Sequence, residues 1–127
     1  MKKFIFTLLF STLVFSSPSY AGWTEVTENV SGDTFYVDFD RIRKHDGYVY
    51  YWELSDLLKP TKYGDLSNKA YTQVDCKLFR SKYLSMSSYK QPMGNGTPSS
   101  TFEPPAEWDY PLPSSGGEFI LKSVCNH

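Results

Sequence analysis

A ten-residue stretch from position 69 to 78 alternates between polar and apolar side chains, and it constrains the fold more than any other part of the chain. The apolar positions share one face of a strand: Ala70, Thr72, Val74, Cys76 and Leu78. The opposite face carries Lys69, Gln73, Asp75 and Lys77. Because a period of two is typical of a strand with one buried face, the pattern predicts a sheet that is covered on one side. A disulfide partner for Cys76 must therefore lie across the apolar face.

The first 21 residues have the three regions of a secretory signal peptide. Met1-Lys2-Lys3 is the positive tip, an apolar run of 12 residues follows, and small residues stand at Ser19 and Ala21. We expect cleavage after Ala21, because the apolar run is shorter than the roughly 20 residues that a membrane helix needs. An uncleaved membrane anchor is the alternative. Gly22 follows the cleavage position, where a lipoprotein would carry cysteine.

Cleavage leaves residues 22–127, a length typical of one domain. We expect it to be exported through the inner membrane to the periplasm, the cell surface or the medium, with no membrane span after cleavage. Of the 13 basic residues two lie in the leader, so 11 remain against 14 acidic ones, a net charge of −3. This balance offers no basic stripe for a phosphate backbone, so we expect no nucleic-acid partner.

Cys76 and Cys125 are the only cysteines of the chain. In an exported protein they most simply pair with each other. A free catalytic thiol and a bridge between two chains are the alternatives. The intramolecular bond would close a loop of about 50 residues, for which the loop-entropy relation gives about 4 kcal/mol as an upper figure. It would tie the end of the chain to its middle.

Further strands and turns are indicated along the chain. Residues rich in β-formers predict strands at 23–27, 34–39, 48–54 and 83–89. The strand at 48–54 carries apolar side chains on both faces, so it could be covered on both sides. Asp40 is placed to cap a helical turn through 41–44, which a turn at 45–47 ends. Residues 80–82 are predicted to form a tight link.

The C-terminal part of the chain is less regular. Residues 91–100 have no periodicity and predict a mobile surface loop. Four prolines between 102 and 113 predict an extended segment outside the sheet, pinned by Trp108. Ser115 and Glu118 have the spacing of a capping box. The residues after them follow helical spacing: Ile120, Leu121, Val124 and Cys125. This short helix must dock to be stable.

These patterns together predict an α+β fold. It consists of an antiparallel β-sheet of about five or six strands, with the short C-terminal helix tethered across one face by the disulfide. The other face is partly open to solvent.

Motifs of the common enzyme classes are missing. The chain has no Gly-x-Ser-x-Gly elbow, no glycine-rich phosphate loop, no His-Glu-x-x-His and no Cys-x-x-Cys. His45 and Asp46 could form an acid–base pair, but such neighbours beside a glycine usually make a solvated turn. Asp38 and Asp40 could share a cation, but capping by Asp40 is the favoured role. We predict a protein without enzymatic activity, cofactor or metal.

Two sets of side chains are candidates for contact with another protein. Arg41, Arg43 and Lys44 form a local excess of positive charge; a solvated face is the default interpretation, and an acidic or sulfated partner is the alternative. This positive region would extend to Lys69, Lys77 and Lys82 if these lysines lie on the solvent-facing side of the sheet. The tyrosines at 48, 50, 71, 83 and 89 either pack across strands or form an exposed surface. The candidate binding residues are Arg41, Arg43, Lys44, Lys69, Lys77, Tyr48 and Tyr83.

A series of landmarks runs in order along the chain. It comprises Phe35-Tyr36-Val37-Asp38 with Ile42, Gly47 to Leu54 around Trp52, Lys59-Pro60, Ser67 with Asp75-Cys76, Pro92-Met93-Gly94 with Gly96, Trp108, and Val124-Cys125. In this order and spacing the chain resembles the surface-adhesin protein E family. The resemblance implies a twisted antiparallel sheet with a C-terminal helix tied across it by the cysteine pair. It also implies exposure at the cell surface, adhesion to host extracellular-matrix or serum proteins, and a capacity to form a homodimer.

Three hypotheses of function result. The first is a non-catalytic adhesin-like protein, exported by a Gram-negative bacterium, that binds host proteins through its open sheet face and the loop at 91–100. The second is a periplasmic structural or assembly protein that contacts envelope proteins. The third is an enzyme that works through a free thiolate at Cys76.

Overall fold

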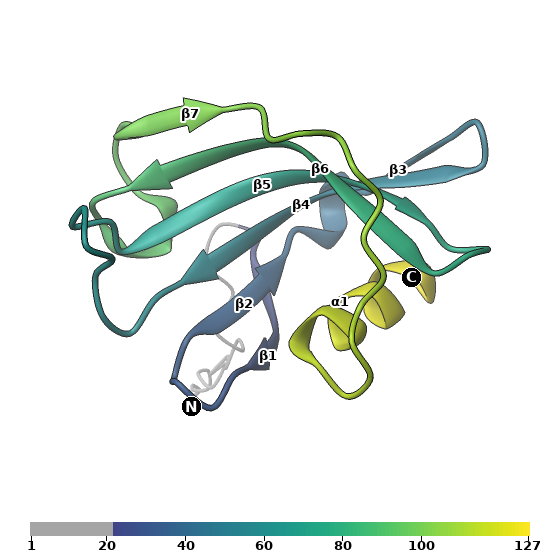
Figure 1. Ribbon diagram of the computed structural model, residues 1–127, viewed down its shortest axis with the longest axis horizontal. Helices are drawn as coiled ribbons and strands as arrows, with labels where there is room; N and C mark the ends of the chain where they lie inside the picture. Colours follow the sequence, from purple (N-terminus) through teal and green to yellow (C-terminus); the bar gives the residue numbers. More distant parts are fainter. Residues whose placement is uncertain (1–21) are drawn as a thin grey trace, which may run out of the picture.

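The computed structural model describes residues 22–127, so the predicted signal peptide lies outside the described residues. The described chain forms one sheet and one α-helix (Figure 1). The strands are β1 (Thr24–Glu28), β2 (Thr34–Val37), β3 (Arg43–His45), β4 (Tyr48–Asp56), β5 (Ser67–Asp75), β6 (Arg80–Tyr89) and β7 (Ser100–Phe102). The helix is α1 (Gly116–Cys125). The predicted α+β class is confirmed.

All strand pairs in the sheet are antiparallel, in the order β1-β2-β4-β5-β6-β7. The short strand β3 pairs with the first residues of β4, whereas β2 pairs with the last residues of the same strand. The described sheet therefore has seven strands, where the sequence patterns predict five or six. The extra strands, β3 and β7, are three residues long each, too short to show a periodic pattern.

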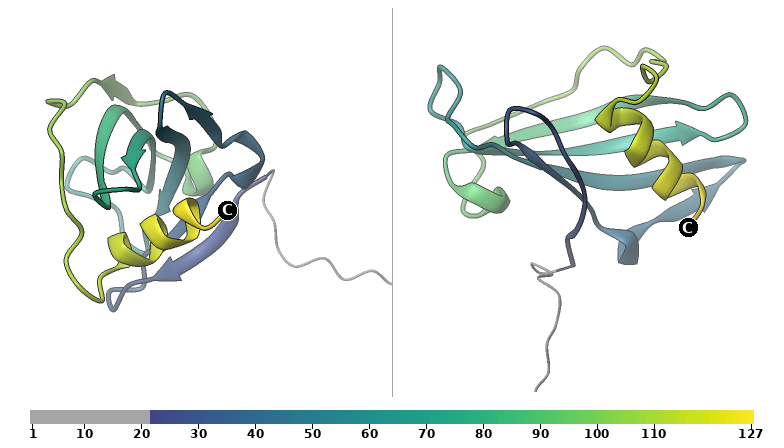
Figure 2. Two further views of the ribbon diagram at one scale, coloured as in Figure 1. Left: turned by 90° about the vertical axis from the view of Figure 1, so that its right-hand side faces the viewer. Right: turned by 90° about the horizontal axis from the view of Figure 1, so that it is seen from below.

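The helix covers one face of the sheet, as predicted. Its N-cap is Ser115, whose hydroxyl accepts a hydrogen bond from the backbone N–H of Glu118 at 3.2 Å. Ile120, Leu121 and Val124 are buried on its inner side. They pack in one core with buried residues of the sheet: Val37, Val49, Tyr51 and Val74. Figure 2 shows α1 crossing this face.

The disulfide joins the end of the helix to the sheet. Cys76 directly follows β5, Cys125 is the last residue of α1, and the two are bonded with their Cα atoms 5.8 Å apart. Both cysteines pack against the core. The tether predicted from the cysteine pair is therefore present, and Cys76 has no free thiol for the third hypothesis.

The turn before β4 is a two-residue hairpin. Asp46 and Gly47 both have positive φ, +52° and +83°. This combination is typical of a type I′ turn, whose twist matches that of the flanking strands. The predicted turn at 45–47 is confirmed, but the predicted helical turn through 41–44 is wrong. A 3₁₀ turn covers Phe39–Arg41 instead, and its cap is the buried carboxylate of Asp38, which accepts from the N–H of Asp40.

Three further expectations are corrected. The alternation of β5 stops at Asp75, so the turn at 76–79 leaves Leu78 56% exposed. Residues 80–82 are the first part of β6, because that turn already provides the tight link. Phe102, which was expected outside the sheet, lies in β7 and pairs with Met86 of β6. This pairing is possible because the prolines begin only after Phe102.

The loop at 91–100 is anchored at both ends. Its first part is a 3₁₀ turn at Pro92–Gly94, in which Gly94 donates to Ser67 Oγ at 2.7 Å and Met93 donates to Asp56 Oδ1 at 2.7 Å. A Cβ at Gly94 would lie 2.4 Å from Lys69 Cε, and φ is +63°, so any other residue there would be strained and would displace the Lys69 side chain.

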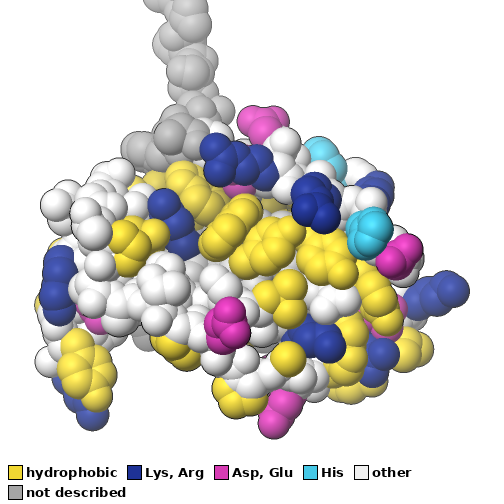
Figure 3. Space-filling model, turned by 90° about the horizontal axis from the view of Figure 1, so that it is seen from above, with side chains coloured by type: hydrophobic (Ala, Val, Ile, Leu, Met, Phe, Trp, Pro, Cys, Tyr) yellow, Lys and Arg dark blue, Asp and Glu magenta, His cyan; other side chains and the backbone are white. Residues whose placement is uncertain are grey.

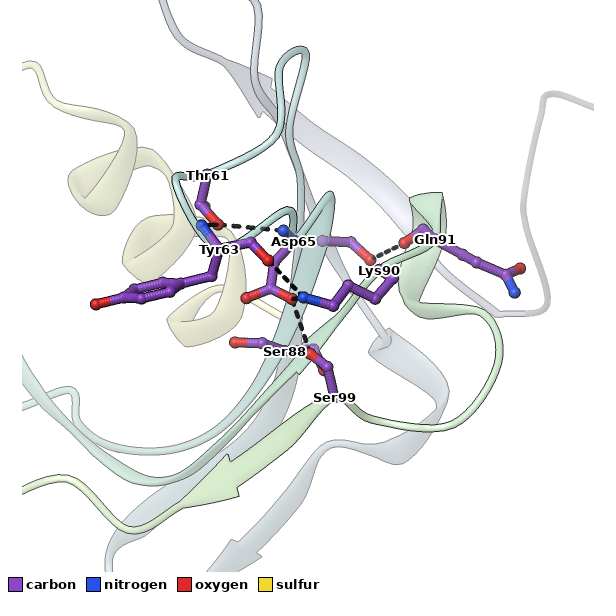
Figure 4. Close-up of polar contacts among 8 residues, drawn as sticks. Thr61, Tyr63, Asp65, Ser88, Lys90, Gln91 and Ser99 are labelled. Atoms are coloured by element: carbon purple, nitrogen blue, oxygen red, sulfur yellow. Dashed lines mark hydrogen bonds and ion pairs between the residues drawn. The ribbon is translucent and has the colours of Figure 1, made fainter.

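Figure 4 shows the second anchor, where the loop meets the connection between β4 and β5. Ser99 donates to Asp65 Oδ1 at 2.7 Å, and Lys90 Nζ lies 3.4 Å from the same oxygen while donating to the carbonyl of Tyr63. Between the two anchors, residues 95–98 are exposed.

Candidate functional site

The face of the sheet opposite α1 carries a row of aromatic side chains. It consists of Tyr48, Tyr50 and Trp52 from β4, Tyr71 from β5, and Trp108, and we call it the aromatic row. All five are half-buried. In the space-filling view of this face, hydrophobic side chains form a band with lysine and arginine at its margins (Figure 3). No helix among residues 22–127 covers this band.

The strands position the row by simple alternation. Tyr50 and Trp52 point away from α1 because Val49, Tyr51 and Glu53 point toward it. The ring of Tyr71 lies 4.8 Å from that of Trp52 and 6.1 Å from that of Tyr50, measured between centroids. Cross-strand packing, the default interpretation of the tyrosines, therefore holds for these rings, and the same rings present their outer sides to solvent.

Trp108 extends the row from a segment that is distant in sequence. Its ring lies 5.8 Å from that of Tyr48. Arg80 and Lys82 approach the same ring, with charged groups 4.4 Å and 4.3 Å from its centroid. The backbone holds the segment in place, because Asp109 and Ser81 exchange hydrogen bonds of 2.7 and 2.9 Å. The prediction that Trp108 pins the proline-rich segment agrees with this geometry.

Arg80 also forms an ion pair with Asp75. The Nε of Arg80 donates to Asp75 Oδ2 at 3.0 Å, while the N–H groups of Lys77 and Leu78 donate to Oδ1. Burial alone would raise the pKa of Asp75, but these hydrogen bonds and the guanidinium charge together hold it below its ordinary value. The ionised carboxylate thus orients Arg80 toward Trp108.

Three other cations on this face have no carboxylate partner. Arg43 lies 5.8 Å from the ring centroid of Tyr50, Lys69 lies 4.9 Å from that of Tyr89, and Lys82 contacts Trp108. None of the three forms an ion pair with a residue in 22–127. Positive charge on this face is therefore paired mainly with aromatic rings, which leaves it available to an anionic group.

A hollow of about 600 Å³ lies on this side of the sheet, next to Trp52 and Lys69. Its lining is Trp23, Asp38, Arg41, Lys69, Met93, Gly94 and Asn95. Arg41 Nε lies 3.4 Å from Asp38 Oδ2. The anchored part of the 91–100 loop therefore borders the same surface as the aromatic row.

The candidate binding residues separate into two groups. Arg43, Lys69 and Tyr48 lie on the face with the aromatic row, and Arg41 lines the hollow. Lys44 pairs with Val49 and Tyr83 pairs with Thr72, so both lie on the side that carries α1. Lys77 lies in the turn after β5. Tyr83 does not share the face of Tyr48, because a bulge between Tyr71 and Thr72 changes the register of β6.

Sequence reasoning missed four contributors to this surface. The sequence predicts that Trp108 holds the proline-rich segment in place and that Arg80 belongs to a tight connection between strands. It assigns Trp23 and Trp52 to strands without a role in binding. Strand alternation places Trp52 beside Tyr50, so that signal was present. The contact between Trp108 and Lys82 joins distant segments and has no local signal.

The described residues offer little for metal or acid–base chemistry. Within 22–127 no group of three or more metal-ligating side chains comes together. His45 Nε2 lies 3.1 Å from Asp46 Oδ2, but both side chains are exposed on the hairpin. In the same part of the chain, no helix has the length and apolar character needed to cross a bilayer.

Comparison with known proteins places the chain in a family. Crystal form II of Haemophilus influenzae protein E has a TM-score of 0.68 at 15% identity, over 90% of this chain and 94% of that one. Protein E from non-typeable Haemophilus influenzae has a TM-score of 0.62 at 14% identity, over 90% and 82%. At these identities the likeness shows a shared fold. No curated protein sequence matches the chain. The sequence model of surface-adhesin protein E matches residues 23–126, and the chain therefore belongs to the surface-adhesin protein E family.

Proposed function

We propose that this protein is a non-enzymatic surface adhesin that binds a host extracellular-matrix or serum protein through its open sheet face. The observation that carries the proposal is the aromatic row, bordered by cations that lack carboxylate partners. Tyrosine and tryptophan provide large contact areas at low entropic cost, and arginine is also enriched at protein interfaces. Membership of the adhesin family supports the same function.

The charges favour an acidic segment of the partner. Arg43, Lys69 and Lys82 can each meet a carboxylate without first breaking an ion pair to a residue in 22–127. Charges at the margin of an interface mainly raise the association rate and set specificity, and salt weakens their effect. Binding through this face is therefore expected to decrease as ionic strength rises.

The test compares charge reversal on and off the face. Purified protein is passed over immobilised matrix and serum proteins, and the double variant Arg43→Glu/Lys82→Glu is compared with Lys59→Glu/Lys62→Glu. Both pairs change the net charge equally, but Lys59 and Lys62 lie in the exposed connection before β5. We expect the first pair to lose at least about tenfold in affinity and the second to bind like the wild type. Equal effects of the two pairs, or no binding by the wild type, would contradict the proposal.

The location of the protein separates this function from periplasmic assembly. Protease added to intact cells should digest a surface adhesin and leave a periplasmic marker intact. Protection of the protein together with that marker would instead favour a partner inside the envelope.

A further inference from the structure

A cavity of about 240 Å³ lies on the other side of the sheet, between the start of α1 and the strands. Its lining comes from the β1–β2 connection, β2, β4, β6 and α1: Asn29, Phe35, Glu53, Tyr83, Gly116, Gly117 and Ile120. Glu53 is only 8% exposed, whereas Tyr83 is 37% exposed and Gly117 is exposed. The cavity therefore has a buried carboxyl at its base and is reached past Tyr83 and Gly117.

Among the described residues, Glu53 has one hydrogen-bond donor and no cationic partner. The hydroxyl of Tyr51 donates to its Oε1 at 2.5 Å. No lysine, arginine or histidine in residues 22–127 forms an ion pair with it. Burying a carboxylate without a countercharge is costly, so a positive charge from outside the chain would be stabilised here.

The titratable groups that face Glu53 are tyrosines and bring no positive charge to it. The charge of Glu53, then burial, then the charge of Asp109 raise the pKa of the Tyr83 hydroxyl. Tyr51 faces Glu53 from its own strand, and α1 contributes only Gly116, Gly117 and Ile120 to the lining. Phe35 and Tyr83 provide aromatic rings, which attract cations through their faces.

We infer that this cavity binds a small organic ammonium ion, with the Glu53 carboxylate as its countercharge and the rings of Phe35 and Tyr83 against its alkyl part. The volume suits a ligand of a few heavy atoms, for which a dissociation constant of about 1–100 mM is expected. The site lies on the face opposite the aromatic row, so it is independent of the proposed adhesive function.

The test is a titration of the purified protein with n-butylammonium at constant ionic strength, followed by NMR shifts of the Phe35 and Ile120 amides. We expect saturable binding at pH 8 that weakens as pH falls and the carboxyl, whose pKa burial raises, becomes protonated. n-Butanol, a neutral ligand of similar shape, should bind at least about tenfold more weakly. Nα-acetyl-lysine methylamide tests the same chemistry on a lysine side chain; its binding would identify a peptide as a second source of the ammonium group.

Two variants keep the result interpretable. Glu53→Gln retains an oxygen that accepts from Tyr51, so it should fold, and it should weaken n-butylammonium binding at least about tenfold. Tyr83→Phe keeps the ring and should bind like the wild type, whereas Tyr83→Ala should bind more weakly. The inference is overturned if the wild type shows no saturable shift, if n-butanol binds equally well, or if Glu53→Gln binds as tightly as the wild type.

Discussion

On β4, Val49, Tyr51 and Glu53 point toward α1, whereas Tyr50 and Trp52 point away from it. The first face is closed by a helix that a disulfide holds in place, and its core residues are less than a tenth exposed. The second has no helix over the aromatic row, whose side chains remain half-buried. The closed face is lined mainly by aliphatic side chains, whereas the open face carries aromatic rings and cations, so residue type as well as the cover of α1 separates the core from the candidate binding surface.

The closed face depends most on its tether. Replacing Cys125 by serine, together with Cys76→Ser to avoid a free thiol, should lower the free energy of unfolding by about 3–4 kcal/mol. The physical reason is that the bond joins residues 49 positions apart and restricts the unfolded chain. Thermal and urea unfolding measure the change, with the reduced wild type as control. An unchanged melting curve would show that α1 is held without the bond.

Packing under the helix gives the next largest effect. Val124 is fully buried, and Val124→Ala should cost about 2 kcal/mol through lost burial and the cavity left behind. Phe119, on the same helix but 54% exposed, is the matched control, and Phe119→Ala should change stability by less than about 0.5 kcal/mol. If both substitutions lowered the free energy of unfolding equally in urea, α1 would not pack on the sheet through the side that carries Val124.

Local patterns predict much of the closed face and little of the open one. The capping box at Ser115 and the spacing of Ile120, Leu121 and Val124 reveal a helix with one apolar side, and the alternation of β5 reveals the face that it covers. Both signals lie within about ten residues. The bulge that turns Tyr83 to the helix side and the bridge that brings Asp109 to Ser81 depend on pairing between distant segments. No single stretch of sequence encodes these two features.

Glu53 breaks the rule that the closed face is apolar, and this exception makes stability depend on pH. Burial raises the pKa of Glu53, although the hydrogen bond from Tyr51 opposes the shift. A carboxyl with a raised pKa in the folded state contributes stability that is fully present below its unfolded pKa and is lost as pH rises through the folded pKa. Relative to the wild type, Glu53→Gln should therefore gain stability between pH 4 and pH 8.

The measurement for Glu53 is urea unfolding of both proteins across that pH range. Glu103→Gln, which removes an exposed carboxyl, is the control and should follow the wild type at every pH. A constant difference between Glu53→Gln and the wild type would mean that Glu53 titrates alike in the folded and unfolded chains.

The smallest effect on stability is expected on the open face. Lys82 lies 4.3 Å from the ring centroid of Trp108 and has no ion pair with a described residue, so Lys82→Gln should cost only about 0.5 kcal/mol. The same substitution should weaken binding to an acidic partner, because it removes a charge that the fold hardly uses. Urea unfolding and a binding assay on one preparation test both parts. A loss of stability close to that of Val124→Ala would show that the aromatic row is a second core rather than a surface kept for contact.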